Sequence, residues 1–206
     1  MPVTAADAIQ VEQDPYVSRA AYKLAGALDE LALDVTDQRA LDAGASTGGF
    51  TQVLLQAGCR EVIAVDVGHG QLVEEIRSDP RVRTYERLNV RDLGLEHVDN
   101  RPVDLVVGDL SFISLALVLP ALVPLLGGPL LLLVKPQFEL QPIDIGPGGK
   151  VKDASAYVHV ERKLRKACAA NGLEVRDWFD SATPGSEGAR EFFLHAMLAT
   201  GRNITP

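Results

Sequence analysis

The sequence predicts an α/β domain built on a mostly parallel seven-stranded sheet with an antiparallel last strand and helices on both faces. Short apolar runs alternate with segments of helical periodicity, and the early runs are continuously apolar, as expected of strands buried on both faces. A glycine-rich loop follows the first run. The connection 182–188 is rich in turn residues and too short for a crossover helix, so the strand after it should be antiparallel to its neighbours.

The elements can be assigned in order along the chain. A helix is predicted over 15–31, because Ala20, Leu24, Ala27, Leu28 and Leu31 recur at helical spacing. Strands are expected at 39–43, 61–67, 82–86, 103–108, 129–135, 173–181 and 191–198. The helices between them are expected at 49–57, 70–77, 114–126 and 154–171.

One segment resembles a membrane span. Residues 110–134 carry no charge, and their number would be enough to cross a bilayer. Pro120, Pro124 and the Gly-Gly-Pro at 127–129 interrupt the run, and a short apolar strand follows. These breaks favour a buried helix, turn and strand over a span.

Length and composition limit the class of protein. A chain of 206 residues forms one α/β domain, and its net charge of −8 argues against a uniformly basic protein that coats nucleic acid. Cys59 and Cys168 lack the spacing of zinc ligands, so we expect free thiols in a reducing compartment and no metal site. No secretory signal is visible at the N-terminus, which predicts a cytoplasmic protein.

The loop after the first strand predicts a nucleotide-type cofactor site. Gly44, Ala45, Gly48 and Gly49 let a ligand approach the backbone, and the amides that open the next helix can meet a carboxylate or phosphate. A dinucleotide site would read G-x-G-x-x-G, whereas this loop reads GASTGG with Asp42 two residues before its first glycine. This form suits S-adenosylmethionine, whose charged amino-acid end needs an acceptor such as Asp42.

A second acid follows at the expected distance. Asp66 closes the next apolar run, about 20 residues beyond the glycines, where a carboxylate at a strand tip reaches ribose hydroxyls. The alternative is that Asp42 and Asp66 only cap loops around a generic Rossmann-like crossover.

Two further polar residues stand at strand ends, where open α/β sheets bind ligands. Asp109 follows the fourth strand and Lys135 follows the fifth. Tip residues of this kind are often only solvated charges or caps. A lysine at the end of an intensely apolar strand can be partly desolvated, which lowers its pKa and allows it to act as a base.

Six blocks of the sequence resemble the signature of TlyA-type proteins, FtsJ-like enzymes known as ribosomal RNA 2'-O-methyltransferases or haemolysins. The blocks are YVSRAAYKL (16–24), LDAGASTGGFT (41–51), DLSFISL (109–115), LVKPQFE (133–139), GPGG (146–149) and EFFL (191–194). They occur in family order and extend from about residue 16 to 198. The resemblance implies a Rossmann-like class I fold that uses S-adenosylmethionine to methylate ribosomal RNA.

The resemblance also implies roles for individual residues. The family's catalytic Lys-Asp-Lys-Glu tetrad maps onto Lys23, Asp109, Lys135 and Glu191. Lys135 would orient or deprotonate a ribose 2'-hydroxyl while the others hold its position and charge. The cofactor would be bound at its methionine end by Asp42, Gly44, Ser46, Gly48 and Gly49, at its ribose by Asp66, and at its adenine by Val67, Asn89 and Val90. Ala45, Phe50 and Asp109 complete the set of cofactor-binding residues that the resemblance implies.

The chain departs from the family at its N-terminus. Family members usually begin with a small RNA-binding domain, whereas we expect a single methyltransferase domain over 1–206, with an extension at 1–15, the core at 16–198 and a tail at 199–206. A missing N-terminal domain or a separate partner would then help to bind ribosomal RNA or the ribosomal subunit. Basic residues that could line the active face are Arg19, Lys23, Lys150, Lys152, Arg162, Lys163, Arg165 and Lys166, although the last four also suit a solvated helix face.

Four other interpretations remain open. GASTG fits the G-x-S-x-G nucleophile elbow of a hydrolase, with His195 later in the chain, but this elbow follows the first strand and His195 falls inside a predicted strand. A small-molecule O-methyltransferase would share the cofactor site. A haemolysin-like membrane-active protein rests on the uncharged run alone, and an inactive cofactor-binding module does not explain a filled tetrad.

Overall fold

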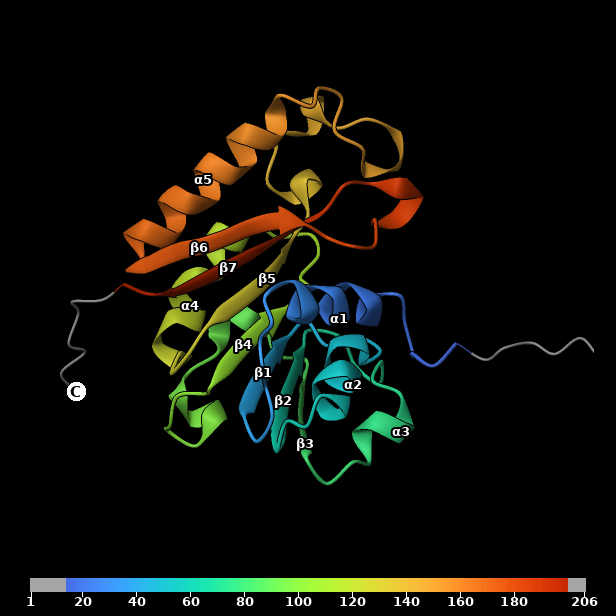
Figure 1. Cartoon of the computed structure of the whole chain (residues 1–206), viewed down its shortest axis with the longest axis vertical. Helices are drawn as coiled ribbons and strands as arrows, with labels where there is room; N and C mark the ends of the chain where they lie inside the picture. The colour runs from blue at the N-terminus through green and yellow to red at the C-terminus, as the bar shows by residue number, and fades with distance from the viewer. Residues whose placement is uncertain (1–13, 200–206) are drawn as a thin grey trace, which may run out of the picture.

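The structure, a computed structural model, describes residues 14–199. Seven strands form one sheet: β1 (Arg39–Ala43), β2 (Glu61–Asp66), β3 (Val82–Glu86), β4 (Leu105–Gly108), β5 (Leu130–Val134), β6 (Leu173–Asp180) and β7 (Phe192–Leu198). Their order is β3-β2-β1-β4-β5-β7-β6, as Figure 1 shows. Strands β1 to β5 pair in parallel, and β7 is antiparallel to both β5 and β6. The predicted fold class and the antiparallel last strand are confirmed.

The strand order places a binding site. From β1 the chain winds outward to β2 and β3, and it then returns to add β4 on the other side of β1. Helices that follow β1 and β4 therefore leave toward opposite faces, which opens a crevice at the carboxyl ends of these two strands. The predicted glycine loop and Asp109 both lie at this point of the sheet.

Helices cover both faces of the sheet. On one face, α1 (Ala20–Glu30), α2 (Gly49–Gln56) and the short α3 (Glu74–Arg77) contribute to a core with Ala40, Val62 and Leu131. On the other, α4 (Leu119–Leu122) and α5 (Ala156–Ala170) pack against Leu41 and Leu130. Strands β4 and β5, between the two layers, are apolar throughout because both of their faces are buried.

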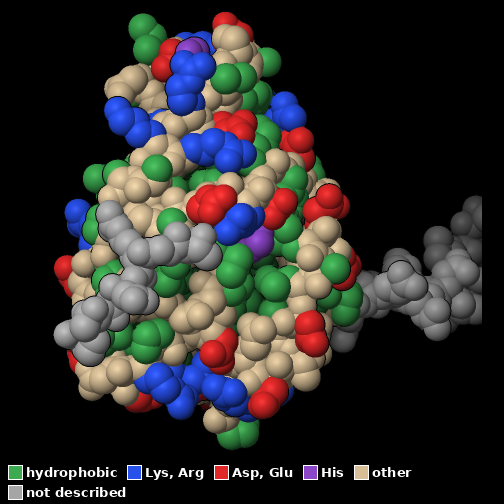
Figure 2. All heavy atoms as spheres, turned by 60° about the vertical axis from the view of Figure 1, so that its left-hand side comes forward, with side chains coloured by type: hydrophobic (Ala, Val, Ile, Leu, Met, Phe, Trp, Pro, Cys, Tyr) green, Lys and Arg blue, Asp and Glu red, His purple; other side chains and the backbone are tan. Residues whose placement is uncertain are grey.

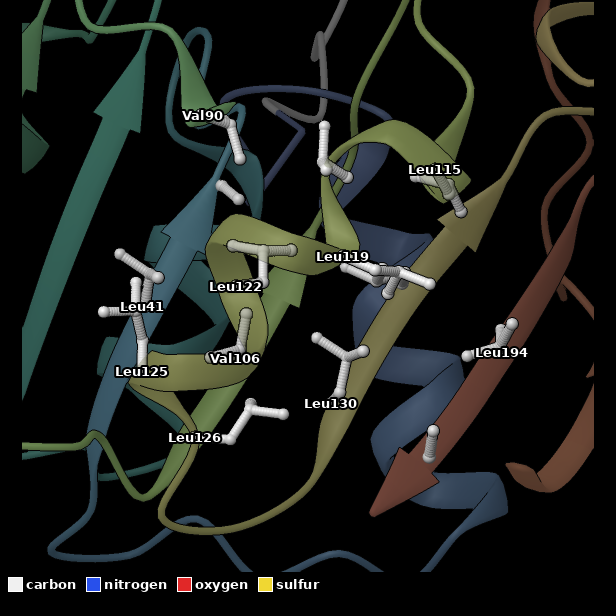
Figure 3. Close-up of a cluster of buried hydrophobic side chains, with 14 of the residues drawn as sticks. Leu41, Val90, Val106, Leu115, Leu119, Leu122, Leu125, Leu126, Leu130 and Leu194 are labelled. Carbon is white, nitrogen blue, oxygen red and sulfur yellow. The ribbon is translucent and has the colours of Figure 1, made fainter. Parts of the chain in front are cut away.

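The uncharged run is part of the core. Figure 3 shows Leu119, Leu122, Leu125 and Leu126 directed at side chains of the sheet such as Val106, and all five are buried. In the part of the chain that the structure describes, no helix has the length and apolar character needed to cross a membrane.

The predicted helix over 114–126 is wrong as a continuous element. The segment forms a 3-10 turn at Leu115–Leu117, the single turn α4, and a second 3-10 turn at Val123–Leu125. Pro120 and Pro124 explain the breaks, because proline has no N–H to donate and its ring crowds the preceding turn.

Smaller corrections concern the edge of the sheet and two boundaries. Strand β3 is only half-buried, and it contains polar residues such as Arg83 and Thr84. It is the edge strand, so its outer side has no partner to exclude water. Helix α3 begins at Glu74 instead of residue 70, and β4 begins at Leu105 instead of residue 103.

Candidate active site

Two adjoining cavities lie at the carboxyl ends of β1, β2 and β4. The larger has a volume of about 490 Å³ and the smaller about 220 Å³. Gly44, Ser46, Asp109 and Ser111 line both, so the two form one elongated cleft. Its size falls in the range of small-molecule sites.

The glycine loop packs closely against the loop that follows β4. Gly44 has φ +88°, and a Cβ atom there would lie 2.7 Å from the carbonyl oxygen of Asp109. Gly48, with φ +103°, precedes the first residue of α2. A Cβ at Gly49 would come within 2.2 Å of Ser18 Oγ, so this glycine lets the N-terminal segment lie across the start of α2. Larger residues would close the cleft at its centre.

Asp66 is held at the end of β2 by two backbone donors. The amide of Ser46 donates to its Oδ2 at 2.8 Å, and the amide of Gly68 donates to its Oδ1 at 2.6 Å. The carboxylate lines the larger cavity together with the predicted adenine-side residues Val67, Asn89 and Val90. The structure therefore brings together the residues predicted for the ribose and the base.

Asp42 requires a correction. Its side chain is 0% exposed and it lines neither cavity, so the expected side-chain contact with the cofactor does not fit its position. Thr51 Oγ1 donates to Asp42 Oδ2 at 2.7 Å, whereas Oδ1 is buried without a hydrogen-bond partner. Burial, together with the nearby charges of Asp109 and Asp66, raises the pKa of Asp42 to about 7, although the hydrogen bond from Thr51 opposes the shift. Asp42 therefore lies behind the cleft wall.

Asp42 should make the stability of the ligand-free protein depend on pH. Because its pKa is about 7 in the fold and near 4 in an unfolded chain, the native state binds the extra proton between these values, and stability falls as the pH rises from 4 to 7. In Asp42→Asn this part of the slope should vanish, and the variant should be more stable at pH 8 by on the order of 4 kcal/mol. Denaturant unfolding of both proteins at pH 5 and pH 8 measures the difference. The exposed Asp29→Asn is the matched control, and an equal slope in wild type and Asp42→Asn would contradict the assignment.

The four candidate catalytic residues form two ion pairs. Lys135 Nζ lies 2.7 Å from Asp109 Oδ1, and Lys23 Nζ donates to Glu191 Oε2 at 2.7 Å. The side chains of Lys23 and Glu191 are only 10% and 3% exposed. In the register of β5 and β7, Val134 lies opposite Phe192, so Lys135 and Glu191 occupy the adjacent ends of the two strands. Lys135 and Asp109 line the smaller cavity, whereas the other pair lies outside the cavity lining.

One more predicted cofactor residue, Gly48, lies outside the cleft wall. Phe50 lines the smaller cavity, although its side chain is only 2% exposed and stacks on Phe193 with ring centroids 6.4 Å apart. Gly48 does not line either cavity, whereas Ala45 and Gly49 line the smaller one. Gly48 shapes the loop, because a Cβ there would lie 2.7 Å from Ile76 Cδ1.

The cleft also contains residues that the sequence analysis did not assign. Ser18, Gln71, Arg91, Ser111 and Phe112 line it. Phe112 is 90% exposed, has φ +62°, and contacts Phe138 at 5.1 Å between ring centroids. Ser111 and Phe112 lie in the DLSFISL block, so their sequence context, and not their residue types, was the available signal.

Glu139 joins the two loops of the catalytic side. Its carboxylate accepts hydrogen bonds from Ser114 Oγ at 2.6 Å, from the Leu115 amide at 2.6 Å and from Lys163 Nζ at 2.7 Å. It thus fixes the loop after β4 to the loop after β5 and to α5. All three donors favour the ionised carboxylate.

Removing this charge should loosen the wall of the cleft. Glu139→Gln keeps the shape but places an amide where charged and neutral donors converge, so we expect a loss of about 1–3 kcal/mol in the free energy of unfolding. Urea denaturation measures it. The matched control is Glu161→Gln, which removes an exposed ion pair on α5 and should change stability by less than about 0.5 kcal/mol. Equal effects of the two substitutions would contradict this role of Glu139.

The hydrolase interpretation does not agree with the position of His195. This residue lies opposite Leu131 in the register of β5 and β7, away from the strand ends where Ser46 stands. Its Nδ1 is 2.7 Å from Asp177 on β6. Another hollow, of about 550 Å³, is an open groove between α1 and α2 that includes Leu28, Asp29 and Val53 and lies apart from the strand ends.

Neither cysteine is placed for chemistry in this cleft. Cys59 and Cys168 are buried, and burial raises the pKa of each thiol to about 11. Among residues 14–199, no three His, Cys, Asp or Glu side chains are grouped to hold a metal ion.

The cleft has the features that S-adenosylmethionine requires. The buried, unpartnered oxygen of Asp42 and the nearby carboxylates of Asp66 and Asp109 favour a positively charged ligand, which the methionine end supplies. Gly44 leaves room for a ligand where a side chain would meet the carbonyl of Asp109. The carboxylate of Asp66 is held in a position to accept hydrogen bonds from hydroxyl groups of a ligand. A sheet of this order with this site at its switch point defines a Rossmann-like class I methyltransferase.

Comparison with known proteins gives the family. The family model described as FtsJ-like methyltransferase matches residues 16–197, and the chain belongs to this family. It is 45% identical over 204 residues, covering 98% of this chain and 76% of the other, to the 16S/23S rRNA (cytidine-2'-O)-methyltransferase TlyA of Mycobacterium tuberculosis. It is 41% identical over 195 residues, covering 93% and 81% of the two chains, to Hemolysin A of Brachyspira hyodysenteriae.

Solved structures agree with this assignment. A putative hemolysin from Streptococcus thermophilus superposes with a TM-score of 0.87 at 40% identity, covering 93% of this chain and 70% of that one. A putative RNA methyltransferase from Pyrococcus horikoshii has the same fold, with a TM-score of 0.63 at 17% identity over 89% and 87% of the chains.

Proposed function

We propose that this methyltransferase transfers a methyl group from S-adenosylmethionine to a ribose 2'-hydroxyl of ribosomal RNA in the cytoplasm. The observation that carries the proposal is the Lys135–Asp109 ion pair, 2.7 Å long, in the wall of the cavity that adjoins the glycine loop. It places an amine where a hydroxyl nucleophile would meet the reacting end of the cofactor.

Each part of the cleft has a role in this reaction. S-adenosylmethionine supplies the methyl group from a sulfonium centre, which needs no metal. Gly44, Ala45, Ser46 and Gly49 would hold its methionine end, Asp66 its ribose, and Val67, Asn89 and Val90 its adenine. Asp42 would favour its positive charge from behind the wall.

Lys135 would act on the nucleophile. A ribose hydroxyl is a weak nucleophile, so it must be oriented and must lose its proton as the new bond forms. Lys135, in its neutral form, accepts that proton, and Asp109 then stabilises the ammonium ion. The buried Lys23–Glu191 ion pair holds helix α1 to the start of β7, beside the end of β5 from which Lys135 extends.

RNA as the acceptor is supported by the similarity to the rRNA (cytidine-2'-O)-methyltransferase of M. tuberculosis and by an exposed aromatic ring at the cleft. Phe112 presents a ring to solvent at the cleft, where it can stack on an unpaired base. On the face that Figure 2 presents, basic and acidic side chains are interspersed, so this face is not uniformly basic. With a net charge of −8, part of the RNA affinity should come from a separate RNA-binding domain or partner.

Removing the ring of Phe112 should affect RNA more than the cofactor. Because base–aromatic stacking contributes about 1–3 kcal/mol, Phe112→Ala should lower the affinity for RNA about 10-fold or more while cofactor binding stays within 2-fold. Leu117→Ala, at another exposed apolar residue of the same segment, is the control. Filter binding of RNA and calorimetric titration of cofactor separate the two effects; equal losses of both would overturn this role.

The proposal is tested by offering the enzyme labelled S-adenosylmethionine with either purified ribosomal subunits or a pool of small hydroxylated metabolites. Label in ribosomal RNA is the expected result. Label only in small molecules would favour a small-molecule O-methyltransferase and overturn the proposed substrate.

A further inference from the structure

Ser111 lies beside the proposed base and makes the contact that sets its orientation. Lys135 Nζ donates a hydrogen bond to Ser111 Oγ at 2.7 Å. Asp109 Oδ1 lies 2.7 Å from the same nitrogen, within an ion pair. Both acceptors come from the loop after β4, and Lys135, Asp109 and Ser111 all line the smaller cavity.

The chemistry of an amine gives these contacts a consequence. A lysine nitrogen has three directions besides its bond to Cε: three N–H donors when it is charged, or two donors and one lone pair when it is neutral. The hydrogen bond to Ser111 fixes rotation about the Cε–Nζ bond and uses one N–H. Asp109 Oδ1 is paired with Nζ by charge and accepts no hydrogen bond from it, and its negative charge repels a lone pair on the side of the nitrogen that faces it.

We propose that Ser111 is the positioning residue that leaves the lone pair of neutral Lys135 in the third direction, toward the acceptor hydroxyl in the cleft. This inference rests on the proposed function of Lys135. In the reaction, the O–H bond of the acceptor breaks and an N–H bond forms at Nζ. The electron pair stays on oxygen, which uses it to form the bond to the methyl carbon.

The neighbouring contacts keep Ser111 in place. Glu139 holds Ser114 and the Leu115 amide, three to four residues beyond Ser111, against the loop that begins at Lys135. The loop after β4 is thus fixed to the loop after β5 at two points, Ser111–Lys135 and Ser114–Glu139. A serine on a freely moving loop would not define the direction of the lone pair.

The proposal predicts a distinct kinetic signature for Ser111→Ala. The kcat should fall about 10-fold because the lone pair of Lys135 is no longer directed, a part of the about 10²–10⁴-fold that general base catalysis contributes. The KM for S-adenosylmethionine should change less than 2-fold. Ser111→Thr, which keeps the hydroxyl, should restore most of kcat.

Ser114→Ala is the matched control, because it removes a hydroxyl from the same loop that bonds to Glu139 and not to Lys135. It should keep kcat within about 2-fold of wild type, because the Leu115 amide still binds Glu139 and holds the loop. A wild-type kcat in Ser111→Ala, or an equal fall of kcat in Ser114→Ala, overturns the proposal. Lys135→Met tests the premise separately: if that variant still transfers methyl at the wild-type rate, Lys135 is not the base.

Discussion

Lys135→Met should reduce methyl transfer by at least about 10³-fold while the protein still folds and binds S-adenosylmethionine. General base catalysis contributes about 10²–10⁴-fold, and methionine retains the volume and apolar stem of lysine without its nitrogen. The cofactor should bind within about 3-fold of wild type, because the glycine loop and Asp66 remain in place. Single-turnover transfer to ribosomal subunits gives the rate, and calorimetry gives the affinity.

Lys166→Met is the control for this substitution, because it removes an exposed lysine from α5, outside the residues that line the cleft. It should retain the wild-type rate. If Lys135→Met lost cofactor binding as well as transfer, the residue would be part of the cofactor site. If it kept the wild-type rate, Lys135 would not be the base.

Breaking the Lys23–Glu191 pair should produce the largest loss of stability. Both side chains are at most 10% exposed, so removal of one partner leaves a buried charge without compensation. Such changes cost about 3–5 kcal/mol, and we expect losses of that order in Lys23→Met and in Glu191→Leu. The double variant should lie closer to wild type than either single variant, because both charges are then absent. Guanidinium unfolding of the four proteins gives the coupling energy.

An exposed ion pair provides the comparison. Arg190 and Asp180 are each about half exposed, and their removal should change stability by less than about 1 kcal/mol with little coupling. Additive losses in the Lys23 and Glu191 variants would show that the two side chains act independently. That result would contradict the proposed support of the active site by a buried pair.

The sheet could be predicted from the sequence because the signals for each strand lie within the strand and in the turns beside it. Strands β4 and β5 are buried on both faces and form unbroken apolar runs, and β1 and β2 have buried apolar centres next to the acids Asp42 and Asp66. The antiparallel β7 followed from the short connection before it. The segment 114–126 was misjudged because its apolar spacing fits a helix, whereas Pro120 and Pro124 divide it.

The site could be predicted in position but not in detail. The loop at Gly44 and the acid Asp66 follow strand ends, so topology alone brings them together. The depth of a side chain depends on packing from distant segments, which is why Asp42 was expected in the cleft and lies behind its wall. The contact of Ser111 with Lys135 joins two loops 24 residues apart, and no periodicity encodes it.

The central claim is that this enzyme methylates a ribose hydroxyl of RNA, and nucleoside mass spectrometry tests it most directly. Ribosomal RNA would be treated with the enzyme and labelled cofactor, digested to nucleosides, and fragmented at the glycosidic bond. If the proposed function is right, the added methyl group stays with the ribose fragment, and the signal disappears with Lys135→Met. A methyl group on the base fragment, or an unchanged signal with Lys135→Met, would contradict it.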